Sequence, residues 1–80
     1  MLNLMEKEKL LKRITINPEQ CGGRPCIRNM RIGVSDVIDM LSEGMLPTEI
    51  IDDFPYLELE DIKASLLYVS RYINHTVIAA

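Results

Sequence analysis

Hydrophobic residues recur at a helical spacing through the second half of the chain. The first such segment has an apolar face made of Val34, Val37, Ile38 and Leu41. Residues three and four positions apart lie on one side of a helix, so this spacing predicts a helix with one buried face. Gly33 opens the segment and Gly44 follows it, and glycine is common just past a helix end. We therefore predict a first helix between these two glycines.

Two more helices are predicted after Gly44. Pro47 and Glu49 suit the first turn of a short second helix, because proline is tolerated there and an acid interacts favourably with the helix dipole. The apolar side of that helix is Ile50, Ile51 and Phe54, and Pro55 ends it. A third and longest helix begins at residues 58–61. Its apolar stripe consists of Ile62, Leu66, Val69 and Ile73, widened by Leu59 and Tyr72.

The first half has the signs of a small hairpin. Residues 13–16 are rich in β-branched side chains and predict a strand, which Asn17-Pro18 ends. Residues 25–28 predict a second strand, Asn29-Met30 a tight turn, and residues 31–32 a returning strand. The first strand pairs with the second either within one chain or between two chains.

Glycine, proline and asparagine set the turns of this pattern. Glycine adopts positive φ without strain, proline fixes its own φ, and asparagine tolerates the left-handed conformation. The turn residues we single out are Gly22, Gly23, Pro25, Asn29 and Gly44.

The predicted fold is mainly α: a three-helix, helix-turn-helix-like bundle of the homeodomain-like or winged-helix-like kind, preceded by a short N-terminal β-hairpin. Residues 14–73 form a single domain. Residues 1–13 precede it as an arm or a short helix, and residues 74–80 follow as a tail whose apolar end either docks on a partner or is disordered. Chains of 80 residues often bury too little surface to be stable alone, so a homodimer is expected.

The charge is divided unevenly along the chain. The net charge is −3, but residues 1–33 carry a balance of +4 and residues 34–80 a balance of −7. A chain of this kind can present one basic and one acidic face. The acidic half could also dock on a basic protein, including the N-terminal half of another copy.

This division decides where DNA could bind. The third helix would enter the major groove in a helix-turn-helix protein, but it begins with Glu58, Glu60 and Asp61, which would face the phosphates. DNA contact therefore falls to the basic half. The candidate DNA-binding residues are Lys12, Arg13, Arg24, Arg28 and Arg31. The alternative is a solvated hairpin with salt bridges to the acidic half, and for Arg31 we prefer a structural role between the turn and the first helix.

Other chemistry finds little support. Cys21 and Cys26 could be bridged, but we expect reduced thiols and a cytoplasmic protein, because no segment is apolar and long enough to span a membrane and no secretory signal is recognised. A zinc site needs about four ligands, and His75 is the single histidine. We expect no metal, no cofactor and no enzymatic activity.

One group of motifs resembles a known family. The motifs are Gly22-Gly23-Arg24-Pro25-Cys26-Ile27, Arg31-Ile32, Gly44, Ile50-Ile51, Asp53, Phe54-Pro55 and Asp61-Ile62. In this pattern residues 14–72 resemble the small bacterial family catalogued as domain of unknown function 433, whose members are similar to VapB-type antitoxins. The chain departs from the family at Asn29 and Met30, where Gly-Thr is usual.

The resemblance implies a function. It implies a small antitoxin-like protein of a type II toxin–antitoxin system, which neutralises a PIN-like nuclease and binds operator DNA as a homodimer. Two alternatives stay open: a DNA-binding transcriptional regulator without a toxin partner, and a homo-oligomeric interaction module that binds no nucleic acid.

Overall fold

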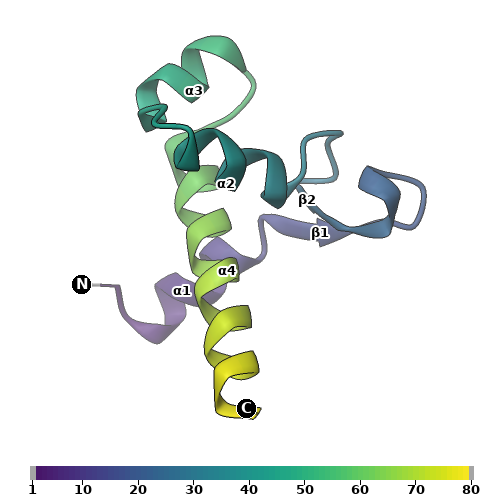
Figure 1. Ribbon diagram of the computed structural model, residues 1–80, viewed down its shortest axis with the longest axis vertical. Helices are drawn as coiled ribbons and strands as arrows, with labels where there is room; N and C mark the ends of the chain where they lie inside the picture. Colours follow the sequence, from purple (N-terminus) through teal and green to yellow (C-terminus); the bar gives the residue numbers. More distant parts are fainter. Residues whose placement is uncertain (1, 80) are drawn as a thin grey trace.

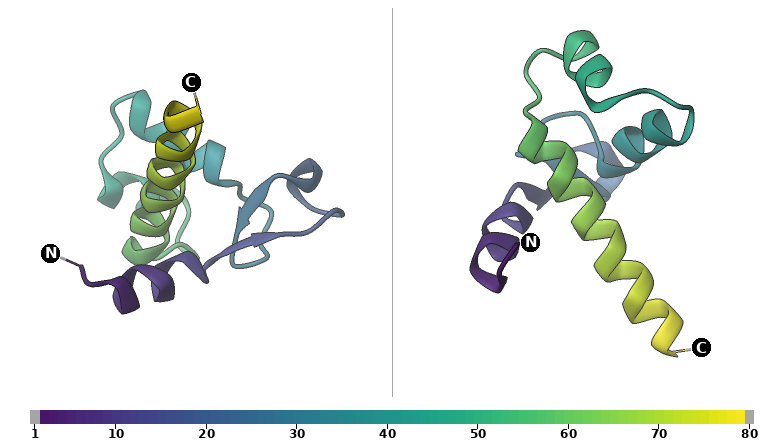
Figure 2. Two further views of the ribbon diagram at one scale, coloured as in Figure 1. Left: turned by 90° about the horizontal axis from the view of Figure 1, so that it is seen from below. Right: turned by 90° about the vertical axis from the view of Figure 1, so that its left-hand side faces the viewer.

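The computed structural model describes residues 2–79, and the side chains of residues 2–74. The element order is α1 (Leu4–Leu11), β1 (Ile14–Ile16), the 3-10 turn η1 (Cys21–Gly23), β2 (Pro25–Ile27), α2 (Val34–Ser42), α3 (Pro47–Asp53) and α4 (Leu59–Ala79). The long helix α4 is the axis of the molecule, with α2 and α3 at its N-terminal end and the β-hairpin to one side (Figure 1). Its C-terminal half projects beyond the other elements (Figure 2).

Four helices are present among the described residues, not the three predicted. The additional helix is α1, which corresponds to the short helix given as one alternative for residues 1–13. Asn3 caps it by accepting a hydrogen bond from the Glu6 amide at 2.8 Å. None of its residues is fully buried, and this explains why its hydrophobic pattern gave no clear signal. The predicted helix-turn-helix arrangement is not confirmed by the packing. The fold is mainly helical, with one short antiparallel hairpin.

The two strands pair within one chain. β1 and β2 are antiparallel, with Ile14 opposite Ile27 and Ile16 opposite Pro25. The turn that follows β2 lies one residue earlier than predicted, because its central residues are Arg28 and Asn29. Both adopt positive φ, 44° and 59°, and the Met30 amide donates to the Ile27 carbonyl at 2.8 Å. Two central residues at positive φ are typical of tight hairpin turns.

The returning strand predicted at residues 31–32 is absent. A single bridge, between Cys26 and Gly33, stands in its place. The reason is that Ile32 is buried in the core and α2 begins at Val34. The segment after the turn is therefore too short to form a ladder of hydrogen bonds with β2.

Cys21 and Cys26 are joined by a disulfide, which corrects the expectation of reduced thiols. That expectation rested on the compartment and not on geometry. The turn between them brings their Cα atoms to 6.3 Å, within the usual range for disulfides. Gly22 and Gly23 adopt φ of 64° and 79° in this turn, a conformation that side chains disfavour.

The core draws on every element from β2 onward. Its buried members are Ile27, Ile32, Val34, Val37, Ile50, Leu57 and Ile62. The amphipathic helices predicted from the sequence supply most of them: α2 begins directly after Gly33 and ends two residues before Gly44, and α3 begins at Pro47. The apolar C-terminal end, for which docking or disorder was predicted, lies outside the described side chains.

Candidate functional site

A buried carboxylate organises the charged residues of the domain. Asp61, in the first turn of α4, has no exposed surface. Arg28 donates to it from Nε, at 2.9 Å to Oδ1, and from Nη2, at 2.8 Å to Oδ2. Arg13 donates from Nη1 to Oδ1 at 3.0 Å, and the Glu58 amide donates to Oδ2 at 2.8 Å. Every oxygen of this carboxylate is therefore hydrogen-bonded, as a buried charge requires.

The same two arginines make further contacts around Asp61. Arg13 Nη1 lies 2.6 Å from Glu58 Oε1, and Arg28 Nη2 donates to the Tyr56 carbonyl at 2.9 Å. Three segments meet here: the residue just before β1, the turn that follows β2, and the start of α4. We call Arg13, Arg28, Glu58 and Asp61 the ion cluster.

Three members of the ion cluster, Arg13, Arg28 and Asp61, are stabilised in their charged forms. Burial alone would raise the pKa of Asp61, but hydrogen bonds from Arg28, the Glu58 amide and Arg13 outweigh it and hold the pKa of Asp61 below its usual value. The hydrogen bonds that Arg13 donates to Glu58 and Asp61 raise the pKa of Arg13, and those that Arg28 donates to Asp61 raise the pKa of Arg28. Arg13, Arg28 and Asp61 therefore form a set of ion pairs.

The ion cluster changes the interpretation of the acidic helix start. The sequence analysis counted Asp61 among three carboxylates that would repel DNA phosphates if this helix entered a groove, but Asp61 is buried and paired. Glu58 and Glu60 remain exposed. Sequence reasoning missed Asp61 as the centre of the site. The available signal was the spacing of Glu58 and Asp61, three residues apart at a helix start, which is typical of a capping box.

The five candidate DNA-binding residues do not gather on one surface. Arg13 and Arg28 share Asp61, whereas the others lie apart from this cluster. Arg24 is exposed, and its Nε donates to the Cys21 carbonyl at 3.2 Å. Arg31 lines a hollow beside Asp36 and Asp39 of α2 and beside Glu43, the C-cap of that helix. Lys12 is the exposed C-cap of α1.

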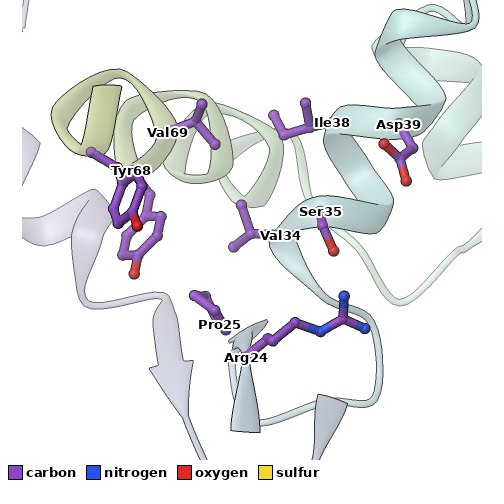
Figure 3. Close-up of a pocket in the computed structure, with 9 residues that line it drawn as sticks. Arg24, Pro25, Val34, Ser35, Ile38, Asp39, Tyr68 and Val69 are labelled. Carbon is purple, nitrogen blue, oxygen red and sulfur yellow. The ribbon is translucent and has the colours of Figure 1, made fainter. Parts of the chain in front are cut away.

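An apolar groove lies between the hairpin, α2 and α4 (Figure 3). It has a volume of about 370 Å³. Its apolar floor is made of Pro25, Val34, Ile38, Tyr68, Val69 and Tyr72. Arg24, Ser35 and Asp39 stand at its polar rim (Figure 3). A surface of this kind can hold an apolar segment and pair charges at its edge.

A second hollow lies on the other side of the two tyrosines. It has a volume of about 670 Å³ and is bounded by α1, β1 and α4 through Leu11, Ile14, Ile16 and Arg71. Tyr68 and Tyr72 line both hollows. The projecting half of α4 is thus flanked by apolar surface on two sides.

The described residues offer no other obvious chemistry. They contain no group of three or more His, Cys, Asp or Glu side chains arranged to hold a metal ion. Within the same part of the chain, no helix is long and apolar enough to cross a membrane.

Comparison with known proteins gives two matches. Residues 14–69 match the sequence profile of a family described as "Protein of unknown function (DUF433)". The fold is similar to the crystal structure of a DUF433 member protein from Anabaena variabilis ATCC 29413. The TM-score is 0.74 at 30% sequence identity, and the match covers 90% of this chain and 71% of that one. No curated protein matches the chain.

Proposed function

The chain belongs to the DUF433 family of proteins of unknown function, and from this we propose that it is a small antitoxin-like protein of a type II toxin–antitoxin system, which binds and neutralises a PIN-like nuclease. It would act in the cytoplasm as a homodimer, without a cofactor and without catalytic activity of its own.

The observation that carries the proposal is the apolar groove. Its floor is almost entirely apolar, and Arg24 and Asp39 at the rim offer one charge of each sign to a bound segment. A nuclease is commonly basic because its substrate is an anion, and the acidic balance of −7 over residues 34–80 complements such a partner. Meanwhile Arg13 and Arg28 are engaged by Asp61, and this reduces the basic surface left for nucleic acid.

Co-expression tests this function. A PIN-like nuclease encoded beside this gene should arrest growth alone, and co-expression of this protein should restore growth and yield a complex. Ser35→Arg, at the groove rim, should abolish rescue. Ser42→Arg, on the same helix but outside the groove, should not. A nuclease that neither binds the protein nor is restrained by it contradicts the proposal.

DNA binding is the second candidate, as an operator contact of the antitoxin or as the whole function. The favourable observation is that Lys12, Arg24 and Arg31 are exposed. Binding should be salt-dependent, and Arg24→Ala should reduce the slope of log K against log salt by about 1. A mobility shift assay at low salt that detects no binding to the gene's own promoter region excludes this candidate and favours a protein-binding module that binds no nucleic acid.

A further inference from the structure

The Cys21–Cys26 disulfide closes a turn that forms part of the apolar groove. The residues between the two cysteines are Gly22, Gly23, Arg24 and Pro25. Of these, Arg24 and Pro25 both line the groove (Figure 3). A change in the state of the disulfide is therefore a change in one wall of the groove.

The two sulfurs differ in their access to solvent. Cys26 lies in β2 and has no exposed surface. It pairs with Thr15 of β1 and forms a bridge with Gly33. Cys21 is partly exposed, and no described atom lies within 4 Å of the position that a Cβ on the neighbouring Gly22 would take. Since disulfide exchange requires access to the sulfur that is attacked, a thiol from solvent reaches Cys21 in preference to Cys26.

The backbone of Cys21 holds Arg24 in place. Cys21 has a φ of 53°, which is uncommon for a residue with a side chain. Its carbonyl accepts two hydrogen bonds from Arg24, one from the amide at 3.1 Å and one from Nε at 3.2 Å. The cross-link fixes Cys21 to β2 in this conformation. Once the cross-link is broken, Cys21 is free to adopt negative φ, and the carbonyl that holds Arg24 moves with it.

We propose that Cys21 and Cys26 form a reversible dithiol–disulfide pair, which exchanges with a low-molecular-weight thiol at Cys21 and thereby sets the position of Arg24 at the groove. A thiolate of the small molecule attacks Cys21 Sγ, the bond between the protein sulfurs breaks, and Cys26 leaves as a thiolate that takes a proton from water. A second thiolate attacks the small-molecule sulfur of this mixed disulfide, and Cys21 leaves and is protonated in the same way. The products are the protein dithiol and the disulfide of the small thiol, so two electrons pass to the protein.

The fold accommodates the thiol that reduction produces at Cys26. Cys26 Sγ lies 3.5 Å from the Arg24 carbonyl, which is an acceptor within reach of an S–H donor. The pairing of β2 with β1 also keeps Cys26 beside the turn. In the oxidising direction Cys26 is therefore the resolving thiol: it attacks Cys21 Sγ in the mixed disulfide, displaces the small thiol and closes the loop again.

The inference rests on the proposed function in one respect. The proposed function places the protein in the cytoplasm, where a disulfide is usually transient and either catalytic or redox-sensing. A pair that cycles between two states fits that compartment. The exchange chemistry itself requires neither the nuclease nor DNA. It is therefore tested on the purified protein alone, and its failure leaves the proposed function standing.

Mass spectrometry identifies the sulfur that is attacked. With glutathione disulfide as the probe, Cys26→Ser should take up one glutathione at Cys21. Cys21→Ser should react at least about tenfold more slowly, because Cys26 is buried. Circular dichroism confirms that both variants are folded, and in urea, where burial is lost, the two should react at similar rates. Equal rates in the folded proteins, or a faster reaction of Cys21→Ser, overturns the proposal.

Nuclear magnetic resonance of the isotope-labelled protein tests reversibility and the effect on Arg24. Reduced glutathione should convert the wild-type protein to the dithiol, and glutathione disulfide should restore the first spectrum. The amide and Nε–H signals of Arg24 should shift between the two states, whereas the amides of Ile62 and Ala64, buried in α4, should not. Cys21→Ser combined with Cys26→Ser should give no response to either reagent. A disulfide that persists in a large excess of glutathione, or Arg24 signals that are identical in both states, overturns the proposal.

Discussion

Arg28 combines an unusual backbone conformation with a bidentate ion pair. Its φ is 44°, which is uncommon for a residue with a side chain. The same conformation turns the guanidinium towards Asp61, which accepts two hydrogen bonds from it. Charge-assisted bidentate pairs are among the strongest polar contacts in proteins, so the Asp61 contact offsets the backbone strain at this turn.

Removing the Asp61 charge should destabilise the domain. Asp61→Asn leaves Arg28 without its anion and Arg13 with Glu58 alone, and we expect a loss of roughly 2–3 kcal/mol. This lies at the low end for a buried pair because both arginines are about one-third exposed, at 29% and 36%. Urea denaturation measures the loss. Glu60→Gln, one residue away and exposed, is the matched control and should change stability by less than about 0.5 kcal/mol.

The lowered pKa of Asp61 also predicts an acid-dependent step in stability. Because the folded pKa lies below the ordinary value of 3.8, the contribution of the carboxylate is present above that value and is lost as the pH falls through the folded pKa. Urea midpoints measured from roughly pH 6 down to pH 2 should therefore drop steeply below pH 4. The drop should be smaller in Asp61→Asn, and an identical pH profile in the two proteins would rule out this role for Asp61.

At the scale of elements, the hydrophobic pattern predicted the helices and the strand whose bounds are set by residues close together in the sequence. The glycines around α2 and Pro47 of α3 marked real helix ends, and the β-branched run predicted β1. A short helix was one of the two alternatives for residues 1–13, and the pattern did not decide between them because α1 buries no residue completely. The ion cluster was not predicted because it joins Asp61 to arginines 33 and 48 residues away. Periodicity in the sequence indicates only contacts between residues that are close along the chain.

The η1 turn offers a test at the same scale. The Cys21–Cys26 disulfide closes a short loop that is also held by a hydrogen bond from the Arg24 amide to the Cys21 carbonyl, at 3.1 Å. A loop of this length gains only about 2 kcal/mol from a cross-link. Cys21→Ser with Cys26→Ser should lower the unfolding free energy by about that amount in oxidising buffer. In reducing buffer the wild-type protein should match the variant; equal stability of the two in oxidising buffer would show that the cross-link contributes nothing.

At the scale of the whole molecule, α4 is packed at one end and projects at the other (Figure 2). Its buried residues lie within its first seven positions, and none between Leu66 and Asn74 is fully buried. Hydrogen exchange at concentrations where the protein is monomeric should therefore be slower at residues 62–65 than at residues 68–74. Equal protection along the helix would contradict this division.

The ion cluster has a consequence for how the sequence can change over generations. A single substitution at Asp61 leaves Arg28 without an anionic partner and Arg13 with Glu58 alone, and one at Arg28 leaves a buried carboxylate with a single guanidinium partner. Replacing a whole buried ion pair with apolar residues is often tolerated, whereas removing one member is not. Positions 13, 28 and 61 should therefore covary among homologous chains, with Asp61 lost mainly where Arg28 has been lost too.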